Sequence, residues 1–139
     1  MKRKIFFAVL VLVISMGIAS AVPVDVGSYK FNIPDGYKQD HMYDINNQKT
    51  FTNFLDTHSN GKTFFKSGDE ITITVNAPDN GDQPDDLAAF FGGDKTEISN
   101  KTGYLSFDGH IYTFSYVNDG DWILVKSTNK DMIKDILPK

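Results

Sequence analysis

Five Asn-Gly or Asp-Gly pairs cut the sequence into short segments, and they constrain its fold more than any other feature. Such pairs supply the positive φ angles that tight hairpin turns require. They begin at Asp35, Asn60, Asn80, Asp108 and Asp119. Between them, apolar and polar residues alternate with a period of two, as at residues 29–33 and 71–75. This alternation is typical of half-buried β-strands, so the sequence predicts antiparallel hairpins.

The clearest of these segments is a C-terminal meander at residues 103–126. A two-residue Asp-Gly turn is expected to pair Leu105 with Tyr112. The next loop is expected to pair Val117 with Trp122. Both hairpins then assign the same residues to each face. The face predicted to join the core carries Leu105, Phe107, Tyr112, Phe114, Tyr116, Ile123 and Val125.

The opposite face of the meander is the candidate binding surface. It carries Tyr104, Ile111, Val117, Trp122 and Leu124, mixed with polar residues. A solvated sheet face is normally polar, whereas tyrosine and tryptophan often anchor interfaces. Alternatively, another part of the chain covers this face, because large exposed apolar patches are uncommon on monomers. Residues 37–49 are the expected cover.

Two short helices are expected beside the strands. The first spans residues 84–91, because Pro84 suits a first helical position and the Gly92-Gly93 pair ends the segment. Leu87, Phe90 and Phe91 give this helix an apolar stripe. The second spans residues 130–137 and ends before Pro138. The sequence thus predicts an α+β fold, an antiparallel sheet of about six strands with two short helices packed on one face.

Residues 1–21 have the three regions of a secretory signal peptide. Basic residues at positions 2–4 precede an apolar run, and the small residues that follow fit a cleavage site after Ala21. The run of about 14 apolar residues is shorter than the roughly 20 needed to span a bilayer, with a retained anchor as the alternative. We therefore expect residues 22–139 to form a single secreted α+β domain, released or associated with the cell envelope and without membrane contact after cleavage.

The composition argues against several classes of function. The chain has no cysteine, which excludes disulfides, thiolate metal sites and a cysteine nucleophile. Its 18 acidic side chains outnumber the 14 basic ones, so nucleic acid is not an expected partner. The sequence contains no G-x-G-x-x-G motif and no phosphate loop, and we expect no cofactor.

The sequence carries no recognisable catalytic motif. The three histidines, His41, His58 and His110, are scattered along the chain in predicted loops and turns. No serine stands in a nucleophile elbow. Carboxylates are frequent, yet nothing singles out a pair placed for glycoside hydrolysis. We expect a non-catalytic protein, with a small extracytoplasmic hydrolase that uses carboxylates as the alternative.

An acidic segment in the middle of the chain allows two interpretations. Its aspartates are Asp79, Asp82, Asp85 and Asp86. Calcium binds flexible clusters of oxygen ligands, so a weak calcium-dependent module is one interpretation. The spacing does not match an EF-hand loop, and a turn followed by a helix N-terminus accounts for these carboxylates. The second interpretation is favoured.

One modification site is predicted from a short motif. Asn100, Lys101 and Thr102 form an N-glycosylation sequon between two candidate strands. On an exported chain, Asn100 is therefore a candidate for glycosylation in a host that has the machinery.

The opening of the predicted domain resembles that of a known family. Residues 29–37 match the F-x-I-P-x-G-[WY] start of PsbP-like domains. Residues 103–104, 112–116 and 119–121 are also similar to small secreted proteins of methanogenic archaea. The resemblance implies an exported antiparallel α+β domain and assigns no catalytic residue.

These patterns predict an exported, non-catalytic binding domain at the cell surface or envelope. Its expected partner is a protein or a cell-envelope component, and the sequence identifies neither the ligand nor the oligomeric state.

Overall fold

The computed structural model describes residues 21–139, of which 57% lie in strands and 14% in helical segments. The strands are β1 (Val22–Val26), β2 (Tyr29–Ile33), β3 (Lys38–Gln39), β4 (Ile45–Thr52), β5 (Leu55–Lys66), β6 (Asp69–Pro78), β7 (Asp94–Ile98), β8 (Lys101–Phe107), β9 (Tyr112–Asn118) and β10 (Asp121–Ser127). The helical segments are the 3-10 helices η1 (His41–Tyr43), η2 (Asp85–Phe91) and η3 (Lys130–Met132), and the α-helix α2 (Ile133–Ile136). The predicted signal peptide lies outside the described residues, apart from Ala21. None of the helices in residues 21–139 has the length and apolar character needed to cross a membrane.

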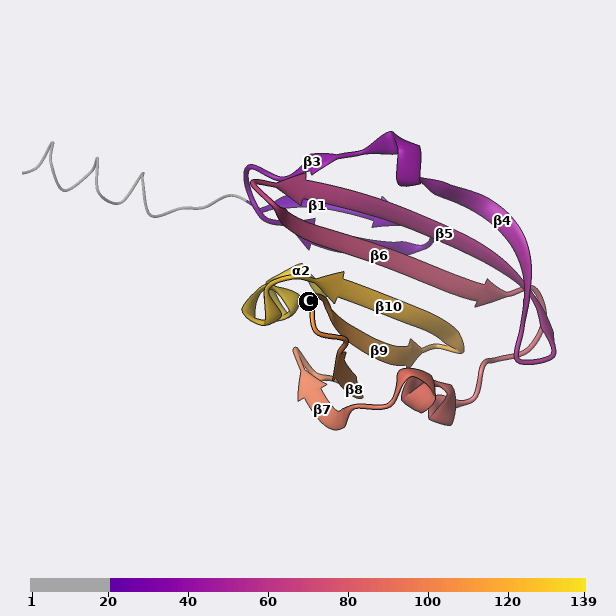
Figure 1. Ribbon diagram of the computed structural model, residues 1–139. Helices are drawn as coiled ribbons and strands as arrows, with labels where there is room; N and C mark the ends of the chain where they lie inside the picture. Colours follow the sequence, from indigo (N-terminus) through magenta and orange to yellow (C-terminus); the bar gives the residue numbers. More distant parts are fainter. Residues whose placement is uncertain (1–20) are drawn as a thin grey trace, which may run out of the picture.

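Eight of the strands form one antiparallel sheet, in the order β3-β5-β6-β10-β9-β8-β7, and β4 also pairs with β5. The remaining two strands, β1 and β2, form a separate hairpin. Strands β7 to β10 pair in chain order, as do β4 to β6, and the two groups join where β6 pairs with β10. Asn76 stands opposite Trp122 at this joint. Figure 1 shows β4, β5 and β6 on one side of the joint and β7 to β9 on the other.

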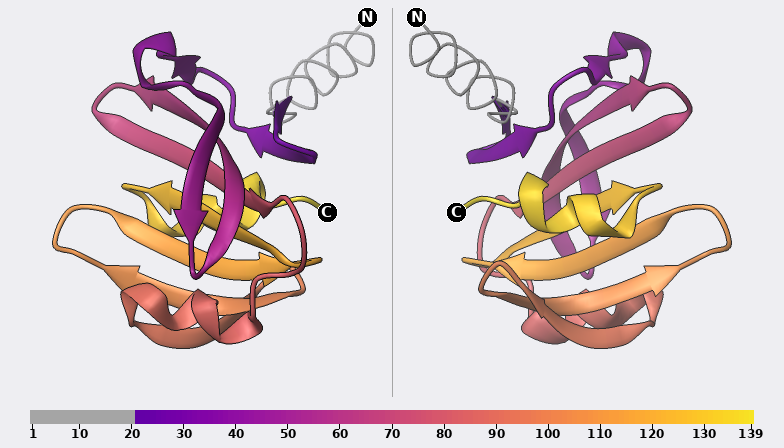
Figure 2. Two further views of the ribbon diagram at one scale, coloured as in Figure 1. Left: turned by 90° about the vertical axis from the view of Figure 1, so that its right-hand side faces the viewer. Right: turned by 90° about the vertical axis from the view of Figure 1, so that its left-hand side faces the viewer.

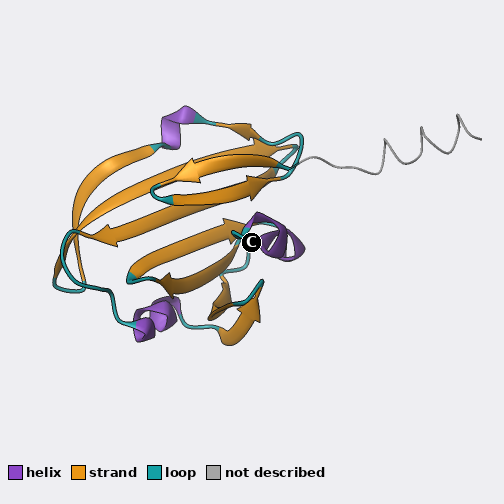
Figure 3. Cartoon of the chain, turned by 180° about the vertical axis from the view of Figure 1, so that it is seen from behind, coloured by secondary structure: helices purple, strands orange, loops and turns teal. Residues whose placement is uncertain are grey.

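One face of the sheet is covered by the β1–β2 hairpin and by α2. The hairpin contacts β5 and β6, and α2 contacts β2 and β10. Figure 3 shows the hairpin lying across the β5–β6 pair. Alternate residues of each strand point into this layer, as the period of a strand requires. The core consists of Val26, Phe31, Ile33, Phe64, Ile71, Ile73, Val75, Phe114, Tyr116, Ile123, Val125, Ile133, Ile136 and Leu137.

The opposite face is covered in part by η2, which contacts β8 and β9. Ala88 is the buried residue of this helix. Beside it, Trp122 and Leu124 are each only 8% exposed. Figure 2 shows η2 and α2 on opposite sides of the β8–β10 strands.

The predicted α+β fold class is wrong, because the described chain is mostly β and its strands form two sheets. Helical segments occupy nearly the expected ranges, at 85–91 and 130–136, but only Ile133–Ile136 is α-helical, and η2 and α2 pack on opposite faces of the sheet. The additional strands are mostly edge strands, which lack the apolar alternation by which a strand is recognised. Residues of β4, for example, are nearly all exposed or half-buried on both faces. Residues 37–49, expected to form a cover, contribute β3, η1 and most of β4 instead.

The predicted register of the meander is right in one hairpin and wrong in the other. Val117 pairs with Trp122 as expected. Leu105, however, pairs with Phe114, because the turn between β8 and β9 has four residues, 108–111. The Asp108 carboxylate accepts hydrogen bonds from the backbone N–H groups of His110 and Ile111 at 2.9 and 2.8 Å, which favours the longer turn. The shift is two residues, so the predicted faces are preserved.

Candidate binding site

A pocket of about 510 Å³ opens between η2 and strands β7, β8 and β9. This volume lies in the usual range of small-molecule sites, about 300–1,000 Å³. From η2 the lining residues are Asp85, Asp86 and Ala88. From the strands and the β7–β8 turn they are Lys95, Asn100, Lys101, Thr102, Gly103, Tyr104, Tyr116, Val117 and Asn118. Short strands and a short helix therefore bring charged, amide, hydroxyl and aromatic groups together in one cavity.

The charged residues of this pocket come from different elements. Asp85 and Asp86 extend from η2, whereas Lys95 stands directly opposite Tyr104 in the β7–β8 pairing. The Lys101 ammonium donates a hydrogen bond to the Asn118 side-chain oxygen at 3.2 Å. Among residues 21–139, the ion pairs involve none of these four charged side chains. Both signs of charge are therefore available to a ligand, in balanced number.

An aromatic platform, consisting of Phe90, Phe91 and Trp122, adjoins the pocket at the other end of η2. The Phe91 ring stacks on Trp122 at 5.9 Å between centroids with an interplanar angle of 23°. The Phe90 ring meets both neighbours edge-on, at 5.1 Å from Phe91 and 5.7 Å from Trp122. Phe90 is 69% exposed and Phe91 is 44% exposed. Such exposure of two large rings on a helix that buries an alanine is unusual for a packing element.

The base of the platform is fixed from two directions. The Trp122 indole N–H donates a hydrogen bond to the Ser115 hydroxyl at 2.9 Å. The chain leaves η2 through Gly92 and Gly93, both at positive φ. A Cβ atom at Gly93 would lie 2.2 Å from the Leu105 carbonyl oxygen, so only glycine permits this close approach. The two phenylalanine rings are thus presented from a rigid support.

Sequence reasoning missed the exposure of these two rings, because it placed Phe90, Phe91 and Leu87 on one apolar stripe of an α-helix. The segment forms a 3-10 helix with three residues per turn, so residues three apart are aligned. Phe91 therefore lies on the same face of the helix as Ala88, and Phe90 lies on the same face as Leu87. The sequence signal that could have located the platform is the adjacent Phe-Phe pair before two glycines, which no single helix face can bury.

The five residues predicted for the binding surface occupy three environments. Tyr104 and Val117 line the pocket. Trp122 and Leu124 are buried, with Trp122 forming the base of the platform. Ile111 is half-buried in the turn between β8 and β9 and is not part of the pocket lining. The cover of this face is η2, so the expectation that residues 37–49 cover it is wrong.

The four candidate calcium ligands separate into different environments. Asp85 and Asp86 line the pocket, while Asp79 pairs with His58. Asp82 lies against Gly120, and a side chain larger than hydrogen at position 120 would collide with its carboxylate. In residues 21–139 no group of three or more histidines and carboxylates has the arrangement to hold a metal ion. Residues 79–84 connect β6 to η2, and calcium binding there stays a prediction.

Asn100, the predicted glycosylation site, lies in the turn that joins β7 to β8. Ser99 and Asn100 both have positive φ angles there, at 49° and 64°. Asn100 is exposed and also contributes to the pocket lining. Glycosylation at this position stays a prediction.

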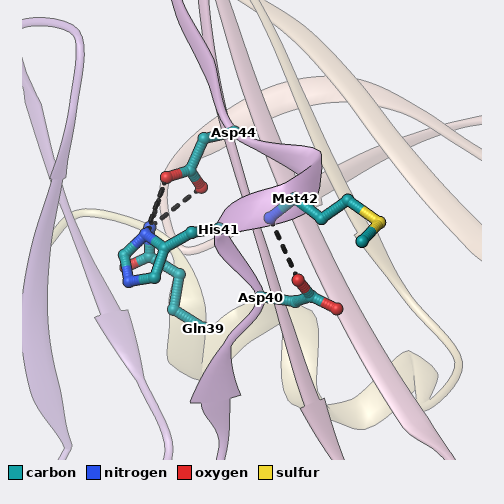
Figure 4. Close-up of polar contacts among 5 residues, drawn as sticks. All are labelled: Gln39, Asp40, His41, Met42 and Asp44. Carbon is teal, nitrogen blue, oxygen red and sulfur yellow. Dashed lines mark hydrogen bonds and ion pairs between the residues drawn. The ribbon is translucent and has the colours of Figure 1, made fainter.

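The histidines lie apart from the pocket and from one another. Figure 4 shows His41 in η1, where its Nδ1 lies 2.8 Å from the Asp44 carboxylate. The Gln39 amide donates to the same carboxylate at 2.9 Å, and these contacts, that of Gln39 foremost, hold the pKa of Asp44 below its usual range. His58 is paired with Asp79 across β5 and the end of β6. Within the described chain, no histidine is hydrogen-bonded to a serine hydroxyl.

Asp121, the first residue of β10, is a carboxylate with a perturbed pKa. The Tyr29 hydroxyl donates hydrogen bonds to the Asp121 carboxylate at 2.8 Å and to the Asn118 carbonyl oxygen at 3.0 Å. Burial raises the pKa of Asp121, the Tyr29 bond opposes this, and Asp119 and Asp82 raise it further. Burial likewise raises the pKa of Tyr29 to about 12.

Replacement of Asp121 by asparagine is expected to stabilise the fold at neutral pH. A raised pKa means that the folded state binds the proton more tightly, so the contribution of Asp121 to stability falls as pH rises from its unfolded pKa of 3.8 through its higher native value. Asparagine keeps an acceptor for Tyr29 and does not ionise. Urea unfolding at several pH values measures the effect. Above this pH range the variant should have a higher free energy of unfolding than the wild type, and at about pH 3 the two should be equal. A larger gain at pH 3 than at pH 7 would contradict the assignment.

No family model, curated protein or solved structure matches this chain.

Proposed function

We propose that the protein is an exported, non-catalytic binding domain that attaches to a component of the cell envelope through the aromatic platform and the adjoining pocket. The observation that carries this proposal is the exposure of Phe90 and Phe91 on a fixed Trp122 base. Rigid exposed aromatic rings lose little conformational entropy on binding, which suits them to anchor an interface. The signal-peptide pattern of residues 1–21 supports export.

The chemistry of the pocket favours binding over hydrolysis. A glycosidase needs two carboxyl groups that face each other across the scissile bond. Asp85 and Asp86 are instead neighbours on η2, and the remaining charged groups of the lining are lysines. None of the three histidines lines the pocket. A set of hydrogen-bonding groups without a facing acid and base is suited to holding a ligand.

Replacement of Phe90 by alanine is expected to weaken retention on cell envelopes isolated from the source organism by about 30-fold, since loss of an anchor ring costs about 2 kcal/mol. The experiment uses the chain from Val22, which contains every described element. Phe90 is largely exposed, so the variant should keep the circular dichroism spectrum and most of the stability of the wild type. Retention is measured by co-sedimentation over a range of envelope concentrations.

Two matched controls locate the binding surface. Phe107 is 54% exposed and stacks on Tyr112 at the end of β8, on the face of the strand opposite to that of Tyr104 in the pocket. Phe54 is 85% exposed at the tip of the β4–β5 hairpin. Phe107→Ala and Phe54→Ala should both be retained like the wild type. Loss of retention in Phe54→Ala with normal retention of Phe90→Ala would move the site to the hairpin tip and refute the proposal.

A further inference from the structure

We infer that the ligand of the platform and pocket is an uncharged carbohydrate chain. This inference rests on the proposed function and adds the chemical class of the ligand. It is carried by the composition of the pocket walls, the geometry of the exposed rings and the continuity of the two along η2.

The pocket walls are suited to a neutral ligand with many hydroxyl groups. Asp85 and Asp86 can accept hydrogen bonds from hydroxyls, and the Lys95 ammonium can donate to hydroxyl or ring oxygens. Thr102 and Asn118 can do either through hydroxyl and amide groups. An anionic ligand would meet the two carboxylates, and a cationic ligand would meet the lysines. A neutral polar ligand can use both walls without like-charge repulsion.

The exposed rings provide the apolar half of such a site. Phenylalanine has no polar atom, so in a neutral ligand its exposed face is complementary to apolar groups or polarised C–H bonds. A pyranose ring presents a flat face of such C–H groups. Phe91 already stacks on Trp122 and has the Lys126 ammonium 5.9 Å from its ring centre. Phe90 is therefore the ring with a face open to the ligand.

The carboxylates of the pocket and the rings of the platform lie at opposite ends of one short helix. Asp85 and Asp86 begin η2, Ala88 lines the pocket at its middle, and Phe90 and Phe91 end it. At a rise of about 2 Å per residue, Asp85 and Phe90 are roughly 10 Å apart along the helix axis. One sugar ring cannot contact both residues over this length, whereas a chain of linked sugars can. A ligand that uses both ends of η2 is thus an oligosaccharide or polysaccharide, not a monosaccharide.

Other ligand classes fit less well. A lipid tail would bury charged side chains of the pocket without partners, which is costly. A peptide would bring backbone N–H and C=O groups that pair best with a free strand edge, while the residues of this site lie on a helix and on the face of β7, β8 and β9 beneath it. A protein ligand is the competing outcome of the test.

The test combines purified neutral polysaccharides with chemically treated envelopes. Affinity gel electrophoresis against a glucan, a mannan and a galactan, each 1,4-linked so that every internal residue keeps its 2,3-diol, should show retardation by at least one of them. Phe90→Ala and Lys95→Ala should each weaken that retardation by tenfold or more, whereas Phe107→Ala should not. The monosaccharide of the retarding polymer should compete poorly.

Envelope treatments separate the failure of this inference from the failure of the proposed function. Periodate, which destroys vicinal diols of sugars, should abolish retention on envelopes, and proteinase digestion of the envelopes should preserve it. Retention that depends on Phe90, survives periodate and is lost after proteinase digestion would overturn the carbohydrate assignment and leave the binding function standing. Retention that is absent or unaffected by Phe90→Ala would overturn both.

Discussion

Replacement of Trp122 by alanine is expected to lower the free energy of unfolding by about 3–5 kcal/mol, the usual cost of truncating a buried aromatic residue. Trp122 is 8% exposed, lies at the joint between β6 and β10, and supports the rings of Phe90 and Phe91. The substitution would also leave the Ser115 hydroxyl without its indole donor. Urea unfolding followed by far-ultraviolet circular dichroism measures the effect without depending on the lost fluorophore.

The control for this substitution is Phe107→Ala. Its ring is mostly exposed and has one stacking partner, Tyr112, so a loss of about 1 kcal/mol is expected. Wild-type fluorescence should also report a tryptophan shielded from solvent. Equal stability losses for the two variants, together with solvent-exposed tryptophan emission, would show that η2 does not cover Trp122.

Replacement of Ile136 by alanine is expected to cost about 2–5 kcal/mol, because the side chain is fully buried and the cavity cannot be filled by the short helix α2 alone. Ile133, Ile136 and Leu137 dock this segment on the core beside β2 and β10. Thermal unfolding gives the comparison. Asp135→Ala, on the exposed side of the same helix, should remain within about 0.5 kcal/mol of the wild type. A similar loss in both variants would mean that burial of the Ile136 side chain in the core is not what stabilises α2.

The central strands could be predicted from sequence because each contributes one face to a core. In β6, β9 and β10 the alternation of residues fixed the inward face, and an error of two residues in one turn left that face unchanged. Edge strands carry no such signal. Both faces of β4 are largely solvated, and β3 consists of two residues only. The α+β assignment followed from overlooking these edges and from giving too much weight to two short helices.

The candidate site was predictable only in its sheet half. The alternation of side chains along a strand was enough to place Tyr104 and Val117 on the correct face of the sheet, and both line the pocket. The platform depends on whether residues 85–91 wind as an α-helix or a 3-10 helix, a choice that tertiary contacts of Ala88 and Gly93 decide. The sequence of residues 85–91 alone does not predict those tertiary contacts. The export signal and the resemblance to PsbP-like domains stay predictions.

The joint between β6 and β10 has a consequence for how quickly the chain can fold. Strands β7 to β10 form a meander of neighbours, and β4 to β6 form another, so each group can assemble through short loops. The hydrogen bond from the Asn76 amide to the Trp122 carbonyl oxygen, by contrast, joins residues 46 apart. Closing that loop costs chain entropy, and the hydrogen bonds between β6 and β10 offset this cost only after the strands have paired. Non-local pairing of this kind is typical of β-proteins that fold in milliseconds to seconds, so we expect the joint that supports the platform to form after the two groups of strands that it connects.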